Sequence, residues 1–501
     1  MKIGEILNPV YDADVGWRPA SGNTKPAHVA NGLVRAIQGA RYDTQRLHEF
    51  VVWWKRGKKP NEERSIEALL EAHPHIYPSS TKDFDRARRY ATGLLGGDSA
   101  LFPTMDNSSF SLTSGLMVTR DHNDRQLGLF AAALMGDPGD HETLAAAVRD
   151  ASSPDAPRDP LTALVWPLLD DGPPTDASGG KPAERVKKAL GRRHNAQFVS
   201  AMSEAARCLA THERAQGNQM RTLQRAVQFA CVATITHAQA LAAGGALSER
   251  PPALMTLAGH RRSEVAVASE RSLDLIFRRF EGWLAGRLAA RIKKGKPLIE
   301  GAEALPFDTT DLRTIRPALA KIAAAKGAHE EPDEALLRER TYYYKSARQL
   351  LGEDVEPAEI LARALVDAYA REFASGGPRR FLKILGCRVG LLYPHFAGRA
   401  KDKRYRPSVP VLDMLVRACV PAGETVPLST LLERLWDRFG LIVGGRRDDT
   451  WDDAAFLAHH DLPVDMPELL ENAERFVDEL AAMGLARRYA DDVTFVGDGH
   501  E

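Results

Sequence analysis

The sequence has few cysteines, and they lie far apart. The four in 501 residues are Cys208, Cys231, Cys387 and Cys419. No two of them have the close spacing that marks a zinc ribbon or a thioredoxin-type site. So sparse a set also argues against a disulfide framework, and it fits reduced thiols in a cytoplasmic protein.

Long apolar runs are missing as well. No stretch of about 18 apolar residues occurs, so the sequence predicts no helix that spans a bilayer. The richest stretch, 229–243, is interrupted by polar residues and indicates a buried helix. The first five residues do not begin a basic and then apolar leader, so we expect no signal peptide. We therefore expect a cytoplasmic protein without a membrane partner.

The common catalytic motifs are also absent. The sequence contains no P-loop motif, no GxGxxG, no HExxH and no GxSxG. The segment Gly179–Lys181 has a lysine after two glycines but lacks the remaining spacing of a P-loop. His260 and the two arginines after it resemble part of the tyrosine-recombinase box, but Ser263 stands where that box needs an arginine. We expect no catalytic residue and no cofactor.

Two polar clusters deserve a test as metal sites. His459-His460-Asp461 resembles the core of an HD-type phosphohydrolase, which would need further ligands such as His122 or His141. Four carboxylates surround Trp451 and could hold magnesium; they are Asp448, Asp449, Asp452 and Asp453. Solvated histidines and an exposed acidic loop explain both clusters more simply. We predict no metal site and keep an HD-type metal-dependent hydrolase as an alternative.

What the sequence does contain favours helix. Alanine, leucine and arginine are frequent, and alternating strand patterns are scarce. The hydrophobic fraction of 44% and the charged fraction of 27% are those of a globular protein. Apolar spacing predicts helices over 195–215, 218–243, 262–293 and 357–375, and a helical pattern also runs through 28–56. The fold class is therefore predicted to be mainly α.

The length predicts several domains. A stretch rich in proline, aspartate and glycine, 151–183, is typical of a linker or a long loop. Around it we expect an N-terminal helical domain (1–150), a central helical domain (184–300), a helical region with a basic tract (301–404) and a C-terminal module (405–501).

The C-terminal module has an order of elements of its own. The predicted elements are a helix over 409–419, an extended piece at 425–427, a helix to about 439 capped by Ser429, a long helix over 466–483, and a hairpin of 485–489 with 493–496. Helix, strand, helix, helix and hairpin is the order of a winged helix. We predict a winged-helix-like domain over 405–501.

Charge is balanced over the chain but segregated within it. The 67 basic and 67 acidic residues cancel. One tract between Gly376 and Ser408 holds nine basic residues against Asp402, a net charge of +8: Arg379, Arg380, Lys383, Arg388, Arg399, Lys401, Lys403, Arg404 and Arg406. A second basic run, 278–296, has a net charge of +6. Runs so dense in basic residues are typical of surfaces that contact phosphates.

Aromatic residues are interleaved with the basic tract, which would permit stacking on bases. We therefore predict that its nine basic residues bind nucleic acid, with DNA favoured over RNA. The alternative is that the tract is a solvated loop or pairs with the chain's own acidic tail.

The end of the chain is acidic. Segment 448–501 has fifteen acids and three arginines, a net charge of −12. Its long helix would occupy the recognition position of a winged helix, where phosphates would repel its acids. We therefore predict that this helix binds other protein subunits through Glu468, Glu471, Glu474 and Asp478.

A resemblance supports this interpretation of the C-terminal module. It is carried by Arg406-Pro407-Ser408, the apolar 411–420, Gly423-Glu424, 428–435 and the stretch Phe439–Gly445. These residues resemble the C-terminal module of accessory proteins in bacterial anti-phage operons, namely methylation-associated and phosphorothioation-dependent defence systems. The resemblance implies a non-catalytic subunit that works beside ATPases and nucleases.

Three functions follow from the sequence. The leading prediction is a non-catalytic, nucleic-acid-associated accessory subunit of a bacterial multi-protein assembly. The second is a protein-binding scaffold without nucleic-acid contact. The third is the HD-type hydrolase.

Overall fold

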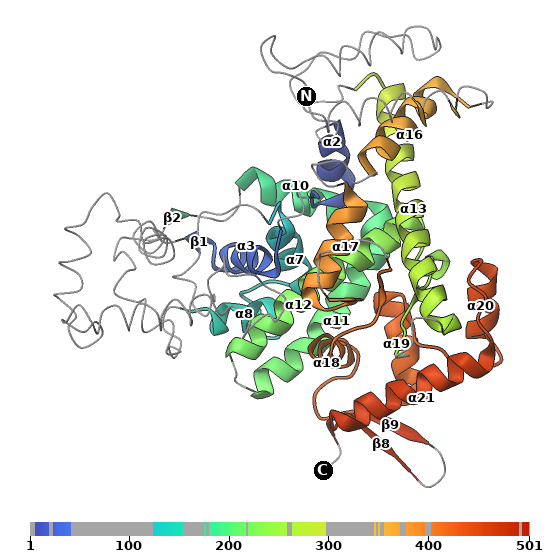
Figure 1. Cartoon of the computed structure of the whole chain (residues 1–501). Helices are drawn as coiled ribbons and strands as arrows, with labels where there is room; N and C mark the ends of the chain where they lie inside the picture. Colours follow the sequence, from blue (N-terminus) through green and yellow to red (C-terminus); the bar gives the residue numbers. More distant parts are fainter. Residues whose placement is uncertain are drawn as a thin grey trace, which may run out of the picture.

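The computed structural model, shown in Figure 1, describes thirteen stretches of the chain. They are 6–19, 24–41, 124–153, 175–176, 180–216, 219–257, 263–296, 345–346, 349–350, 355–370, 377–395, 402–489 and 493–499. The C-terminal module is described almost completely. The predicted linker at 151–183, most of 301–354 and the helical pattern beyond residue 41 lie mainly outside the described residues.

The described chain is mainly helical, as the composition predicts. Its three longest helices match three predicted ranges; they are α11 (Ala196–Gln216), α12 (Gln219–Ala242) and α13 (Glu264–Lys293). Helix α12 is buried on nearly every side, and polar residues within it bond inside the fold, as His237 does to Asn195 and Gln239 to the Pro251 carbonyl. Ser263 fixes the start of α13, where its hydroxyl accepts a hydrogen bond from the Ala266 N–H at 3.2 Å.

N-terminal elements form a layer against α11 and α12. They are α2 (Asn8–Val10), the π-helical η1 (Tyr11–Val15), α3 (Pro26–Gln38), α7 (Leu127–Met135), α8 (Leu144–Ala151), α10 (Gly180–Leu190) and the 3-10 turn η5 (Arg193–Asn195). Helices α3 and α7 cross at two glycines. A Cβ on Gly128 would lie 2.1 Å from the Gly32 carbonyl carbon, so the approach needs glycine there.

Two further helices pack on the long ones. Helix α16 (Pro357–Ala370) lies along α13, as Figure 1 shows, and α17 (Pro378–Val389) packs on α12 and contacts α16. Helix α17 begins with Pro378 at its first position and ends at Gly390, whose φ of 92° is left-handed. The predicted helix over 357–375 is thus present to Ala370, and the residues just after it are not described.

Short strands connect parts that are distant in the sequence. They are β1 (Ala40–Arg41) with β2 (Thr175–Asp176), β3 (Ala253–Leu254) with β7 (Leu441–Ile442), and β4 (Leu392–Tyr393) with β5 (Arg404–Tyr405). The β3–β7 pair is parallel, and it attaches the C-terminal module to the segment between α12 and α13. A short 3-10 turn, η6 (Leu247–Glu249), precedes β3.

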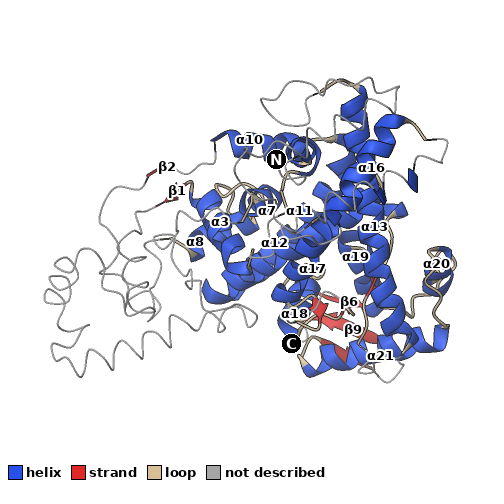
Figure 2. Ribbon diagram, turned by 45° about the horizontal axis from the view of Figure 1, so that its top comes forward, coloured by secondary structure: helices blue, strands red, loops and turns tan. Residues whose placement is uncertain are grey.

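The C-terminal module has helices at the predicted places and a small sheet, seen beside α21 in Figure 2. Its elements are α18 (Val409–Arg417), β6 (Thr425–Pro427), α19 (Leu428–Phe439), β7, α20 (Asp453–His459), α21 (Met466–Ala482), β8 (Ala486–Arg488) and β9 (Thr494–Gly497). The antiparallel sheet has the order β6-β9-β8, and Val496 pairs with both Val426 and Ala486.

Two details of this module differ from the prediction. Helix α19 begins at Leu428 with Pro427 at its N-cap and no side-chain cap, so the predicted capping role of Ser429 is wrong. The extended Thr425–Pro427 runs straight into the helix, which leaves Ser429 inside the first turn. Strand β7 and helix α20 were not predicted, since a two-residue strand and a seven-residue helix leave little periodic signal.

The buried side chains form one large cluster and a smaller one. The large cluster includes residues from Ile6 to Val496 and joins the N-terminal layer, the long helices and the C-terminal module. The smaller cluster joins β3, α13, α19, α20 and α21. The proposed domain boundaries stay predictions, but the described segments share a continuous apolar interior. None of the described helices has the length and apolar character needed to cross a bilayer.

Candidate nucleic-acid interface

The first half of the predicted basic tract lies on α17, against acids of α13. Arg379 donates through Nε and Nη2 to the two carboxylate oxygens of Glu281, at 3.0 and 2.5 Å. Lys383 Nζ lies 3.2 Å from Asp274 Oδ1. Burial raises the pKa of the Glu281 carboxyl, and Arg379 opposes that shift. These cations therefore stabilise the packing of α17 on α13.

Three more cations of the tract also have partners within the chain. Arg388 Nη1 donates to the Thr24 carbonyl at 2.7 Å, which ties α17 to the N-terminal layer. Lys403 Nζ donates to the Pro394 carbonyl at 2.8 Å. Lys403 and Arg404 are only 3% and 4% exposed, and Arg404 lies over a tyrosine ring beside β5. Burial on this scale keeps both side chains away from a ligand at the surface.

The remaining four cations are placed differently. Arg380 and Arg406 are half-buried, and the Arg406 guanidinium carbon lies 5.3 Å from the Tyr393 ring centroid. Arg399 and Lys401 lie outside the described residues. The prediction that the tract binds nucleic acid stays a prediction, and its accessible share is smaller than the sequence count of nine.

A second basic surface, which the sequence analysis did not single out, lies on α10 and η5. Four of its cations are exposed: Lys181, Lys187, Lys188 and Arg193. Within the part of the chain that the structure describes, none of the four forms an ion pair or a hydrogen bond. Arg192 is exposed too and donates to the Ala13 carbonyl at 3.2 Å. We call these five residues the α10 basic face.

Helix α10 presents this face because its other side is apolar. Val186, Ala189 and Leu190 are buried, and the helix packs on η1 and α7. The lysines occupy the opposite side of the helix, at the positions left to solvent. The sequence does indicate this surface, because residues 181–193 contain six basic residues and a single acidic one, Glu184.

The acids beneath the α10 basic face are already paired. Asp12 contacts Arg18 and lies 3.4 Å from Arg185. Asp14 accepts from Arg287 at 2.5 Å and 3.2 Å. The positive charge of the exposed side chains is therefore not cancelled by these neighbours, and it extends into solvent.

An aromatic ring lies beside this surface. Trp283 of α13 is half-buried and meets the His194 ring edge-on, with centroids 5.5 Å apart. The guanidinium carbon of Arg287 lies 5.9 Å from the Trp283 ring centroid. Cations next to an accessible aromatic ring are the combination that contacts phosphates and stacks on unpaired bases.

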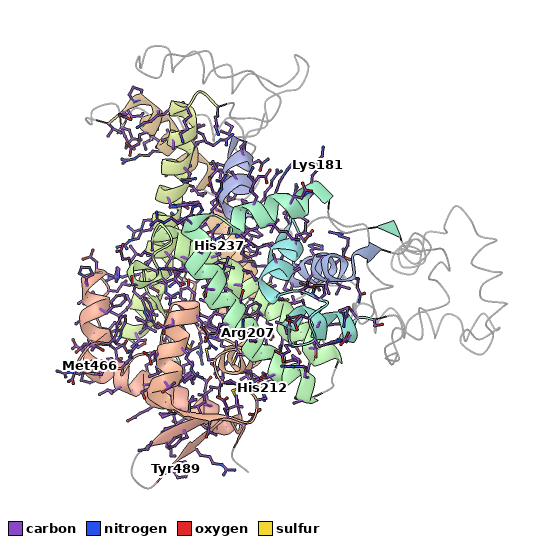
Figure 3. All side chains as sticks on the ribbon, turned by 180° about the vertical axis from the view of Figure 1, so that it is seen from behind. Lys181, Arg207, His212, His237, Met466 and Tyr489 are labelled. Atoms are coloured by element: carbon purple, nitrogen blue, oxygen red, sulfur yellow. The ribbon has the colours of Figure 1, made fainter. Side chains whose placement is uncertain are left out.

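The acidic residues predicted to bind protein lie on α21. Glu471, Glu474 and Asp478 are exposed, whereas Glu468 is half-buried. Arg475 pairs with Glu471 at 2.5 Å, and Arg488 of β8 pairs with Asp478 at 2.9 Å. Figure 3 shows that Lys181, which belongs to the α10 basic face, lies far from Tyr489, which lies at the end of β8.

The carboxylates around Trp451 have structural partners. Asp452 caps α20 by accepting from the Ala455 N–H at 3.0 Å, and Asp453 accepts from the Trp451 indole N–H at 2.7 Å. Asp448 accepts hydrogen bonds from the backbone and hydroxyl of Thr450. These bonds shape the loop before α20.

The histidine–aspartate group is also engaged. His460 is 7% exposed, its ring packs on Phe456, and Arg279 Nη2 lies 3.4 Å from its Nδ1. Burial and the nearby guanidinium lower the pKa of His460 to about 4. His141 is exposed, and His122 lies outside the described residues. Among the described residues, no three His, Cys, Asp or Glu side chains gather where they could hold a metal ion.

No protein-family model matches this chain, and neither does any curated protein.

Proposed function

We propose that the chain is a non-catalytic accessory subunit of a bacterial multi-protein assembly, and that it contacts nucleic acid through the α10 basic face. The supporting observation is the set of four exposed cations that have no partner within the described residues. Cations of this kind release condensed counterions when they approach phosphates, and that release drives binding. The neighbouring Trp283 would add stacking on an unpaired base.

The C-terminal module is proposed to be a winged helix. Its element order and its sheet order β6-β9-β8 support this assignment. Helix α21 then takes the place of a recognition helix, and its acids would be repelled by a DNA backbone. The module would accordingly dock a protein subunit, as the resemblance to accessory proteins of anti-phage operons also suggests.

The test is binding to labelled duplex DNA, single-stranded DNA and RNA across a salt series. The variant K181E/K187E/K188E/R193E reverses the four unpaired cations, all of which are exposed, so it should fold normally. We expect at least a tenfold loss of affinity at low salt, because contacts to phosphates supply most of the non-specific affinity.

A matched control carries the same change in charge at other exposed cations. The variant R207E/R214E/R271E/K345E reverses four of them on α11, on α13 and before α16. It should keep most of the wild-type affinity. Equal losses in the two variants would show only a general effect of net charge and would refute the α10 site.

The basic tract needs a separate variant. R399E/K401E changes two of its residues and avoids Lys403 and Arg404, whose reversal would bury an acid in the fold. A loss of affinity in this variant alone would place the nucleic-acid site on the tract.

The scaffold without nucleic-acid contact is the second candidate. It is favoured by the five tract cations that already have internal contacts: Arg379, Lys383, Arg388, Lys403 and Arg404. This candidate predicts that the protein binds neither duplex DNA, single-stranded DNA nor RNA at low salt. It also predicts a stable complex with another protein.

A further inference from the structure

Helix α21 and the β8–β9 hairpin form one continuous surface. Arg488 of β8 pairs with Asp478, and its Nη2 also lies 3.4 Å from the Glu474 carbonyl. The hairpin is closed by the Tyr489 N–H, which donates to the Val493 carbonyl at 3.0 Å. The exposed side of the helix and the end of the hairpin are therefore held side by side. We call this surface the acidic docking face.

Apolar side chains are concentrated on this face. Five large apolar side chains are exposed in the described part of the chain, and three of them lie here. Leu470 is 48% exposed, Tyr489 50% and Val493 38%. Leu470 lies one helical turn before Glu474, and the other two lie at the end of the hairpin. A grouping of exposed apolar residues with a polar rim is typical of a protein-binding surface.

The charge of the face selects the kind of partner. Segment 465–489 has six acids and three arginines, a net charge of −3. Arg475 pairs with Glu471 and Arg488 with Asp478, and both acids stay exposed beside Glu474, so the face keeps an excess of negative charge. Glu471, Glu474 and Asp478 are spaced three and four residues apart, which places them along one side of the helix.

We infer that the acidic docking face binds a positively charged amphipathic segment of a partner protein, with basic residues opposite the three acids and apolar residues against Leu470, Tyr489 and Val493. The inference rests on the proposed function, since it names the chemistry of the partner that the C-terminal module would dock. Charge complementarity would set the orientation and the rate of association, and the apolar contacts would supply most of the affinity.

The test uses a labelled synthetic peptide as the probe. It is an amphipathic helix with lysines spaced three and four residues apart and leucines beside them, and its control replaces every lysine with glutamate. Binding to the full chain is measured by fluorescence anisotropy. We expect the basic peptide to bind and the acidic peptide not to bind.

Variants of the chain locate the site. E471K/E474K/D478K should weaken binding of the basic peptide at least tenfold. E142K/E184K/E249K makes the same change in charge at exposed glutamates elsewhere and should leave the affinity within about twofold, since distant exposed charges are screened. L470S should weaken binding at high salt, where the apolar contacts dominate.

Three results would overturn the inference. The basic peptide could fail to bind, or it could bind E471K/E474K/D478K as well as wild type. Self-association of wild type that the same reversal abolishes would assign the face to a second copy of the chain. Nucleic-acid binding by the α10 basic face is measured separately with K181E/K187E/K188E/R193E, so the failure of one site leaves the other intact.

Discussion

At the scale of single residues, a buried histidine connects the N-terminal layer to the long helices. His237 is fully buried, and its Nδ1 accepts a hydrogen bond from the Trp17 indole N–H at 3.0 Å. Its Nε2 must then carry the proton, which it donates to Asn195 Oδ1 at 2.9 Å. Asn195 in turn donates to two backbone carbonyls. The neutral ring therefore completes the hydrogen bonds of the Trp17 indole and the Asn195 amide oxygen. Burial lowers the pKa of His237 to about 3.

This lowered pKa predicts a dependence of stability on pH. Above a pH of about 6.5, the ordinary pKa of histidine, the ring is neutral in both the folded and the unfolded chain. Below it the unfolded chain binds a proton that the folded chain does not, so stability is lost as the pH falls towards 3.

The test compares H237Q with wild type. We expect the thermal midpoint of wild type to fall more between pH 7 and pH 5 than that of H237Q. Glutamine can accept and donate at similar places but does not titrate. The exposed H141Q serves as the control and should behave as wild type. Parallel curves for H237Q and wild type would contradict this account of the ring.

Arg250 is buried like His237, but its polar atoms lack hydrogen-bond partners among the described residues. It is 1% exposed, and none of its three guanidinium nitrogens has a hydrogen-bond partner among the described residues. Its guanidinium carbon lies 4.5 Å from the Trp436 ring centroid, and burial lowers its pKa to about 9. A buried charge without such partners costs free energy that a cation–π contact offsets only in part.

We therefore expect R250L to leave the free energy of unfolding unchanged or to raise it by about 1 kcal/mol. The thermal midpoint should stay the same or rise accordingly. Arg438 supplies the contrast, since it donates to the Ala418 carbonyl at 2.5 Å and to Glu204 at 2.7 Å. R438L should lower the midpoint, and calorimetry measures both. A clear loss of stability in R250L would disprove this interpretation.

At the scale of elements, the periodic pattern of the sequence predicted the long helices, but not their partners. Helices α11, α12 and α13 fall within two residues of the predicted ranges, because each buries a continuous apolar stripe. The acids that pair with Arg379 and Lys383 lie 98 and 109 residues away. No local pattern shows such pairings, so the sequence does not reveal which cations of the tract have partners within the fold.

The ion pair between α17 and α13 gives a prediction for these two helices. R379A leaves the carboxylate of Glu281, whose side chain is only 12% exposed, without its main partner. We expect the free energy of unfolding to fall by about 1–3 kcal/mol. The loss should lie towards the lower end of this range, because solvent screens the partly exposed Arg379. Affinity for nucleic acid should not change.

The neighbouring Arg380 is the control for that experiment. It is half-buried, and no hydrogen bond or ion pair holds it among the described residues. R380A should leave the midpoint close to that of wild type. If R379A lost affinity for DNA while its midpoint stayed unchanged, the internal role given to Arg379 would be mistaken.

A buried amide bonds helix α21 to the segments that follow β3 and β7. Asn472 is 2% exposed; its Oδ1 accepts from the Leu257 N–H at 2.8 Å, and its Nδ2 donates to the carbonyls of Met255 and Val443 at 2.9 and 2.6 Å. N472A would leave three buried backbone groups without partners, at a cost of about 3 kcal/mol or more. Hydrogen exchange should accelerate at Leu257 and along α21.

The exposed E471A, one residue earlier on the same helix, is the control for N472A. It should keep the wild-type pattern of exchange, because Glu471 is exposed and the bond that its side chain forms within the described residues is to Arg475. Unchanged exchange in N472A would show that apolar packing and the β3–β7 pair hold α21 without this amide.

At the scale of the whole molecule, charge is separated although the totals cancel. The sequence shows the acidic end directly, since the acids of α21 follow one another closely. The α10 basic face is harder to find, because its cations follow a proline- and glycine-rich stretch and precede the first predicted central helix. Only the fold shows that the acids beneath them, Asp12 and Asp14, are already paired. Accessible charge, rather than charge along the chain, decides where a polyanion can bind.

The most direct test of the central claim is the salt dependence of binding to duplex DNA. Four phosphate contacts made by Lys181, Lys187, Lys188 and Arg193 predict a slope of about −3 to −4 in a plot of log affinity against log salt. In K181E/K187E/K188E/R193E the slope should fall close to zero, while R207E/R214E/R271E/K345E keeps the wild-type slope. A steep slope that the α10 reversal leaves unchanged, or no binding by wild type at low salt, would contradict the account.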